Sequence, residues 1–111
     1  MAIQIYEKPT CTTCRKLAKL LAERGIGYER VEYHVLGLTE DEVRDLLAKT
    51  GASAADLLRR REPGAKELAA AGEDAIVAAM AQRPELLERP VVVNGDRAVL
   101  ARPIERALEI L

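Results

Sequence analysis

The stretch that decides the fold is residues 3–21, IQIYEKPTCTTCRKLAKLL. Ile3–Tyr6 alternates apolar and polar side chains and is followed by Pro9, which is typical of a short strand that ends in a turn. The composition becomes helical from Thr12 onward. Apolar residues then recur at the spacing of one helical face, at Cys14, Leu17, Ala18 and Leu21. This stretch therefore predicts a strand, a turn and an amphipathic helix.

A second strand and a group of helices are predicted next. Gly25 ends the first helix as a C-cap would, and Tyr28–Tyr33 is rich in Tyr and Val that alternate with charged residues, as in a strand. A strand, a helix and a strand within about thirty residues predict a parallel β-α-β unit with a right-handed crossover. The following segment predicts helices that begin after the caps Thr39 and Ser53, and another over Glu73–Gln82.

The last part of the chain predicts a hairpin and a final helix. Pro90–Val93 and Ala98–Leu100 are apolar strands joined by a turn at Asn94-Gly95. Pro103 suits the first position of a helix with apolar residues at helical spacing, at Ile104, Ala107, Leu108 and Leu111. We expect one α/β domain over residues 1–111: a four-stranded mixed sheet flanked by helices, with a helical insertion between the second and third strands.

The composition disfavours several classes of function. Lys and Arg number 17 against 18 acidic residues, which disfavours nucleic acid and anionic membranes as partners. The chain has no Phe and no Trp, so it offers no aromatic platform for bases or a flat cofactor. The sequence shows neither a signal segment nor a run long enough to span a bilayer, which predicts a cytoplasmic protein. We expect a monomer because no long exposed apolar face is evident.

The two cysteines are candidates for redox catalysis. Cys11 lies where the first strand meets the first helix, and a helix N-terminus or a nearby cation lowers a thiol pKa from about 8.5 to roughly 3.5–7.5. Lys8 and Arg15 are close in sequence and could support the thiolate. Cys14 lies one turn later on the apolar face, where it could act as a resolving thiol. The alternative is two incidental thiols; a metal site needs two more ligands, and only His34 is available.

Three arginines are candidates for binding an oxyanion, because a guanidinium supplies both charge and directed donors. Arg59 follows two leucines in the helical segment, whereas Arg89 and Arg102 each precede a proline. The alternative for each is a solvated arginine. Pro90 opens a strand opposite the reactive cysteine, where thiol oxidoreductases of this fold usually carry a cis peptide, so we predict a cis Arg89–Pro90 bond.

Together these residues resemble the arsenate reductase family of glutaredoxin-linked enzymes over nearly the whole chain. The segments that carry the resemblance are YEKPTCTTCR at 6–15, LLR at 57–59, ERPVVV at 88–93, ARP at 101–103 and LEIL at 108–111. The resemblance implies a thioredoxin-like (glutaredoxin-like) fold and no bound cofactor. It also implies that the Cys11 thiolate attacks arsenate, that Arg59, Arg89 and Arg102 hold the oxyanion, and that glutathione and glutaredoxin complete the reduction to arsenite.

Two positions depart from that family. The family usually has a histidine where this chain has Glu7, and a carboxylate there would oppose thiolate formation. The family also usually has serine where this chain has Cys14, which opens a route in which Cys14 resolves the adduct and thioredoxin reduces the disulfide.

Two other functions stay open at this point. CTTCRK at 11–16 is similar to the cysteine pair of redox-sensing Spx-type transcription regulators, which bind RNA polymerase. A general dithiol-disulfide reductase is the third possibility, since fold and motif alone do not fix the substrate.

Overall fold

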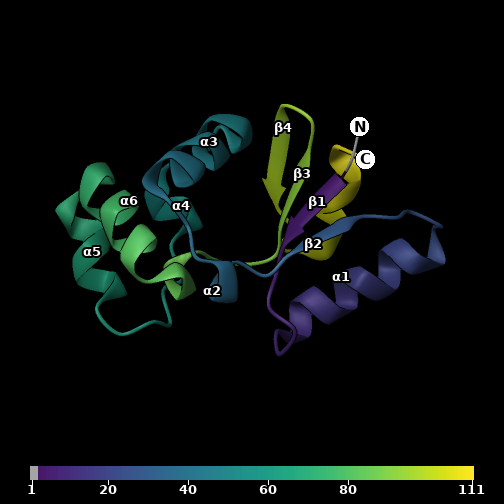
Figure 1. The fold of residues 1–111 in the computed structure, drawn as a ribbon, viewed down its shortest axis with the longest axis horizontal. Helices are drawn as coiled ribbons and strands as arrows, with labels where there is room; N and C mark the ends of the chain where they lie inside the picture. Colours follow the sequence, from purple (N-terminus) through teal and green to yellow (C-terminus); the bar gives the residue numbers. More distant parts are fainter. Residues whose placement is uncertain (1–2) are drawn as a thin grey trace. The chain divides into compact units, whose positions relative to one another are not determined.

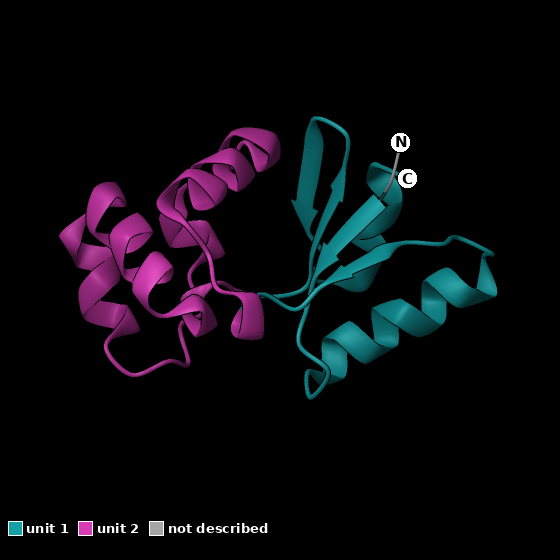
Figure 2. Ribbon diagram, viewed as in Figure 1, with its two compact units in different colours: residues 1–33, 89–111 teal, residues 34–88 magenta. Residues whose placement is uncertain are grey.

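The computed structural model describes residues 3–111, which divide into two compact units (Figures 1 and 2). The first unit comprises residues up to Tyr33 together with Arg89–Leu111, and the second is His34–Glu88. The predicted order of a β-α-β unit, a helical insertion and a terminal hairpin is confirmed. One domain over residues 1–111 stays a prediction.

A four-stranded mixed sheet forms the centre of the first unit. Its strands are β1 (Ile3–Tyr6), β2 (Glu29–Val31), β3 (Val91–Asn94) and β4 (Arg97–Leu100), in the spatial order β2-β1-β3-β4. β1 pairs with β2 in parallel and with β3 antiparallel, and β3 pairs with β4 antiparallel. The topology matches the predicted thioredoxin-like arrangement.

Helix α1 (Thr12–Glu23) begins and ends where the sequence predicts. At its end, the backbone N–H of Gly25 donates to Ala22 and that of Ile26 donates to Leu21, which is a Schellman motif. The motif requires a left-handed residue, and Gly25 supplies it with φ of 68°. This stop turns the chain back toward β2.

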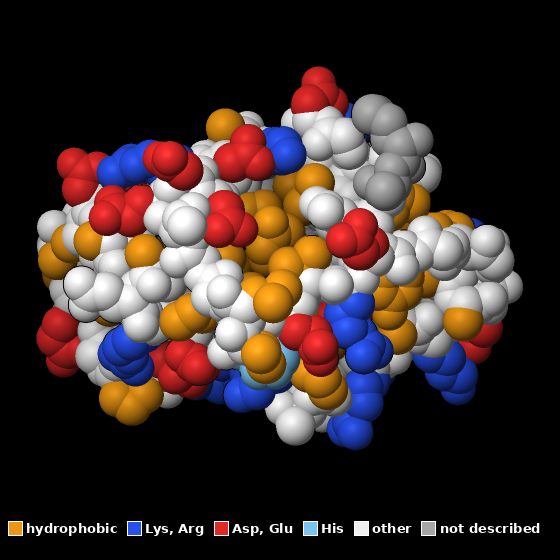
Figure 3. Space-filling view, in the orientation of Figure 1, with side chains coloured by type: hydrophobic (Ala, Val, Ile, Leu, Met, Phe, Trp, Pro, Cys, Tyr) orange, Lys and Arg blue, Asp and Glu red, His pale blue; other side chains and the backbone are white. Residues whose placement is uncertain are grey.

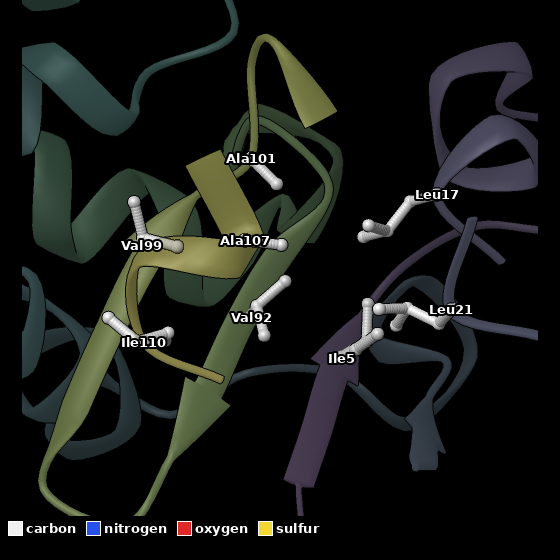
Figure 4. Close-up of a cluster of buried hydrophobic side chains, with 8 residues drawn as sticks. All are labelled: Ile5, Leu17, Leu21, Val92, Val99, Ala101, Ala107 and Ile110. Carbon is white, nitrogen blue, oxygen red and sulfur yellow. The ribbon is translucent and has the colours of Figure 1, made fainter. Parts of the chain in front are cut away.

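One apolar cluster holds α1 and the C-terminal segment against the sheet. The register aligns Ile5, Val92 and Val99 across three strands, and Figure 4 shows Leu17 and Leu21 of α1 directed toward them. The same cluster includes Ala107 and Ile110. The packing of this cluster therefore fixes the positions of β1 and α1 on either side of the turn that joins them.

The final helix differs from its prediction. Residues Ile104–Glu109 form a 3₁₀ helix, η2, rather than an α-helix that begins at Pro103. A 3₁₀ helix places every third residue on one face, so Ile104, Ala107 and Ile110 meet the core, while Leu111 is exposed. The helical spacing that included Leu108 and Leu111 was therefore wrong.

Two strand predictions were also inaccurate at their ends. β2 covers only Glu29–Val31, and Tyr33, predicted as its last residue, begins the short helix α2 (Tyr33–Leu36). The hairpin turn consists of Gly95-Asp96, because Asn94 pairs with Arg97 inside the ladder. Gly95 has φ of 65°, as the first central residue of a tight hairpin turn requires.

The helical unit contains the predicted insertion between β2 and β3. Its helices after α2 are α3 (Glu40–Thr50), α4 (Ala54–Leu57), α5 (Ala65–Ala71), α6 (Glu73–Gln82) and the 3₁₀ turn η1 (Pro84–Leu86). Helix α5 was not predicted, because Gly64 provides no side-chain cap and the helix is rich in alanine. Within residues 3–111, every helix falls short of the length and apolarity that a membrane-spanning helix needs.

The predicted capping box of α3 is present, and it gives a test of local stability. The Thr39 hydroxyl accepts from the Glu42 backbone N–H at 3.1 Å, and the Glu42 carboxylate accepts from the Thr39 N–H at 3.1 Å. We expect Thr39→Ala to lower the free energy of unfolding by about 1 kcal/mol in denaturant titrations, because an N–H of the first turn loses its partner. Thr39→Ser keeps the acceptor, so a similar loss in that variant would contradict the explanation.

Candidate active site

Cys11 is the N-cap residue of α1. Its backbone is extended, and its Sγ accepts a hydrogen bond from the Cys14 backbone N–H at 3.2 Å. The Cys11 N–H donates to the Lys8 carbonyl at 3.0 Å, so a tight turn after β1 fixes the position of the sulfur. The predicted location of Cys11 at the positive end of the α1 dipole is confirmed.

The surroundings of Cys11 favour its thiolate. Burial raises the pKa of the Cys11 thiol, but hydrogen bonds from Cys14 and the charge and hydrogen bond of Arg89 outweigh this effect. The net result is a Cys11 pKa below the ordinary value. Cys11 is therefore the more nucleophilic of the two sulfurs, because the thiolate is the reactive form.

Cys14 has the opposite character. Its side chain is 2% exposed on the inner face of α1. Burial raises the pKa of Cys14 to about 12, and its hydrogen bond with Cys11 contributes in the same direction. Both cysteines are free thiols in the structure. Both residues are buried, and the pair combines an acidic thiol with a neutral one a single helical turn away.

Arg89 is the cation that acts on Cys11. The Arg89–Pro90 bond is cis, as predicted. The Arg89 side chain is buried, and its Nη1 donates to the Tyr33 hydroxyl at 3.5 Å. Burial acts to lower the pKa of Arg89, but the interactions with Tyr33 and Cys11 outweigh this effect, and the net result is a raised pKa. The guanidinium therefore stays charged. A held cation beside a thiolate is suited to an anionic substrate.

Arg102 supports the backbone of Arg89. Its Nε donates to the Arg89 carbonyl oxygen at 2.8 Å, and the Ala101 N–H donates to the Pro90 carbonyl at 2.9 Å. The Arg102–Pro103 bond is also cis, which was not predicted from the sequence. The structure thus brings Arg102 and Arg89 together at the two ends of the β3–β4 hairpin.

Arg59 lies in the helical unit and has acidic partners there. Its Nη1 lies 2.7 Å from a Glu88 carboxylate oxygen, and its Nε lies 3.8 Å from Glu62. These carboxylates offset much of the charge that was expected to bind substrate. The spacing of Arg59 and Glu88, 29 residues apart, gave no sequence signal for this pair.

The remaining predicted residues have smaller roles in the geometry. Lys8 contributes its carbonyl to the turn before Cys11, and Arg15 is exposed on α1 with its backbone N–H bonded to the Cys11 carbonyl. Residues 3–111 hold no group of three or more His, Cys, Asp or Glu side chains placed to bind a metal ion.

Glu7 is a buried acid that pairs with Arg30. Its side chain is almost fully buried and accepts from Arg30 Nε at 2.8 Å. The negative charge of Glu7 contributes to the raised pKa of Cys14, whereas the pKa of Cys11 is lowered overall. Arg30 pairs with the Glu7 carboxylate and Arg89 acts on the Cys11 sulfur, so the Cys11 thiolate is favoured with Glu7 in place. The opposition of Glu7 to that thiolate stays a prediction.

The comparisons with known proteins identify the family of this chain. A model of the ArsC family matches residues 6–110. The chain belongs to the ArsC family. Among related sequences, the uncharacterized protein YfgD of Escherichia coli is 39% identical, over 98% of this chain and 96% of its own length. An arsenate reductase of Neisseria meningitidis is 36% identical, over 98% of this chain and 97% of its own length.

A solved structure of an ArsC relative shares the fold over the full chain. The arsenate reductase from Vibrio cholerae superimposes with a TM-score of 0.91 at 34% identity, covering 100% of this chain and 98% of that protein. The four-stranded mixed sheet with its flanking helices is thus the fold of this ArsC chain.

Proposed function

We propose that this protein is an arsenate reductase in which Cys11 is the nucleophile. The observation that carries the proposal is the acidic Cys11 thiol at the N-terminus of α1, next to the buried Arg89 cation. The names of its ArsC relatives in Neisseria meningitidis and Vibrio cholerae support arsenate as the substrate. The same names favour an enzyme over an Spx-type regulator.

The first step joins sulfur to arsenic. The Cys11 thiolate attacks arsenate, a bond forms between Sγ and arsenic, and one arsenate oxygen leaves as water after it is protonated. Arg89 balances the charge of the thiolate and the oxyanion, and hydrogen bonds from the guanidinium orient the arsenate oxygens. Arg102 holds Arg89 in place and belongs to the proposed oxyanion-binding set. Arg59, for which the family resemblance also implies oxyanion binding, belongs to the helical unit, where Glu88 and Glu62 offset its charge.

The second step uses Cys14 as the resolving thiol. Its sulfur loses a proton and attacks Cys11 Sγ, the sulfur–arsenic bond breaks, and the electron pair stays on arsenic. Arsenic(V) becomes arsenic(III), arsenite leaves, and a Cys11–Cys14 disulfide forms. Thioredoxin, a dithiol donor, then returns two electrons and two protons. In the other route, glutathione attacks the adduct and glutaredoxin supplies the electrons.

The remaining parts of the proposal concern the setting. We place the enzyme in the cytoplasm, because reducing thiol systems operate there. We also propose that it acts as a monomer without a bound cofactor. Acidic and basic side chains are both spread over the face drawn in Figure 3, which fits a small oxyanion rather than nucleic acid as the substrate.

The function is tested by NADPH consumption with arsenate. One reaction contains glutathione, glutaredoxin and glutathione reductase, and the other contains thioredoxin and its reductase. Turnover in either reaction supports arsenate reduction and identifies the donor. If neither reaction consumes NADPH but a protein disulfide is reduced, the general dithiol-disulfide reductase is the correct function.

Replacing Cys14 separates the two routes of resolution. We expect Cys14→Ser to lower kcat with thioredoxin by more than about a hundredfold, because a serine hydroxyl cannot displace the adduct. A variant with Cys14→Ser that keeps full activity in the thioredoxin reaction would refute Cys14 as the resolving thiol. Full activity with glutathione and glutaredoxin would instead assign resolution to glutathione.

A further inference from the structure

Tyr33 is a buried residue that the proposed chemistry does not yet use. Its side chain has no exposed surface, and its hydroxyl lies 3.5 Å from Arg89 Nη1. The ring packs against Tyr6, with centroids 6.2 Å apart at an angle of 42°. The backbone of Tyr33 begins α2, directly after the edge strand β2. The hydroxyl is thus fixed by packing on one side and faces the guanidinium on the other.

The chemistry of this partner differs from that of the partners of Arg59. Arg59 contacts the carboxylates of Glu88 and Glu62, which offset its charge. A tyrosine hydroxyl accepts a hydrogen bond but carries no charge at neutral pH. Contact with Tyr33 can therefore orient the Arg89 side chain without itself offsetting the positive charge.

We propose that Tyr33 is a positioning residue that holds the Arg89 guanidinium against Cys11 Sγ. The inference rests on the proposed function of Cys11 as the nucleophile. Arg89 is then held at two points, since Arg102 binds its carbonyl oxygen and Tyr33 binds its side chain. The hydroxyl is neutral, so this contact orders the guanidinium beside the thiolate without offsetting its charge.

The test measures Cys11 directly and needs no arsenate. Alkylation of Cys11 by iodoacetamide is followed against pH in the Cys14→Ser protein, so that one thiol reacts. We expect Tyr33→Phe to slow alkylation about threefold at pH values below the Cys11 pKa, because a less ordered cation stabilises the thiolate less. The rate at high pH, where Cys11 is fully ionised, stays the same. Tyr28→Phe, which removes a hydroxyl elsewhere in the same unit, is the matched control and leaves the profile unchanged.

A second variant shows whether Tyr33 acts through Arg89. In an Arg89→Ala background, Tyr33→Phe is expected to have no further effect on the alkylation profile. The inference fails if Tyr33→Phe leaves the profile unchanged, or if its effect persists without Arg89.

The same measurements separate this inference from the proposed function. If Arg89→Ala shifts the profile and Tyr33→Phe does not, only the role of Tyr33 is wrong. If Arg89→Ala also leaves the profile unchanged, the proposed part of Arg89 in the reaction is wrong, and with it the role of Tyr33.

Discussion

Arsenate turnover is expected to fall by at least about a thousandfold when Cys11 is replaced by serine. The serine hydroxyl is not ionised near neutral pH, so it does not form the bond to arsenic that starts the reaction. Cys11 is the nucleophile because its sulfur has the lowered pKa, while Cys14 is held as a neutral thiol. The NADPH-coupled assay measures kcat with either donor system.

Thermal unfolding of the Cys11→Ser variant shows whether the substitution leaves the fold intact. The serine introduced by Cys11→Ser can still cap α1, since serine is a preferred N-cap residue, so the thermal unfolding of the variant should match that of the parent protein. Mass spectrometry after alkylation should then show that the rapidly labelled thiol, which is Cys11 in the parent protein, is absent from the variant. Turnover above one tenth of the parent rate would remove Cys11 from the mechanism.

The second large effect is expected for Arg89→Ala, in which kcat/KM for arsenate falls by more than about tenfold. Arg89 lowers the pKa of Cys11, so its removal raises that pKa. The thiolate is present above the lowered pKa and is lost as pH falls through it. The acidic limb of the pH–rate profile should therefore move to higher pH, and the defect should be largest under acidic conditions.

Two further variants make the Arg89 result specific. Arg24→Ala removes an exposed arginine at the C-terminal end of α1, about 18 Å along the helix axis from the N-terminus where Cys11 lies. This variant should leave both kcat/KM and the pH profile unchanged. Arg89→Lys keeps a charge without the planar pair of donors and should give an intermediate value. An Arg89→Ala enzyme with an unshifted acidic limb would limit Arg89 to a structural role.

The parts of the site that were predictable from sequence are those set by local patterns. Cys11 follows a strand and a turn and precedes an apolar helical stripe, and these signals lie within about ten residues of it. The cis bond at Arg89–Pro90 was predicted from a proline that begins a strand. Such signals depend on neighbours in the chain, so a single sequence contains them.

Partners that are distant in the sequence could not be predicted. Tyr33 and Arg89 are 56 positions apart, and Glu7 and Arg30 are 23 apart. Their side chains meet only because β1 pairs with β2 on one side and β3 on the other. Neither periodicity nor capping patterns record which charged residue receives which partner, so the pairing of Glu7 with Arg30 was not predicted.

The contact between Tyr33 and Arg89 also has a consequence for folding. It joins the two points at which the chain leaves and re-enters the sheet unit, and so closes a loop that contains all of His34–Glu88. Closing a long loop costs chain entropy before any native contact repays it, and this slows the formation of non-local contacts. The acidity of Cys11 should therefore appear late in refolding, after the helices have formed. A rapid-quench experiment that measures the alkylation rate of Cys11 at successive refolding times would therefore report when this loop closes.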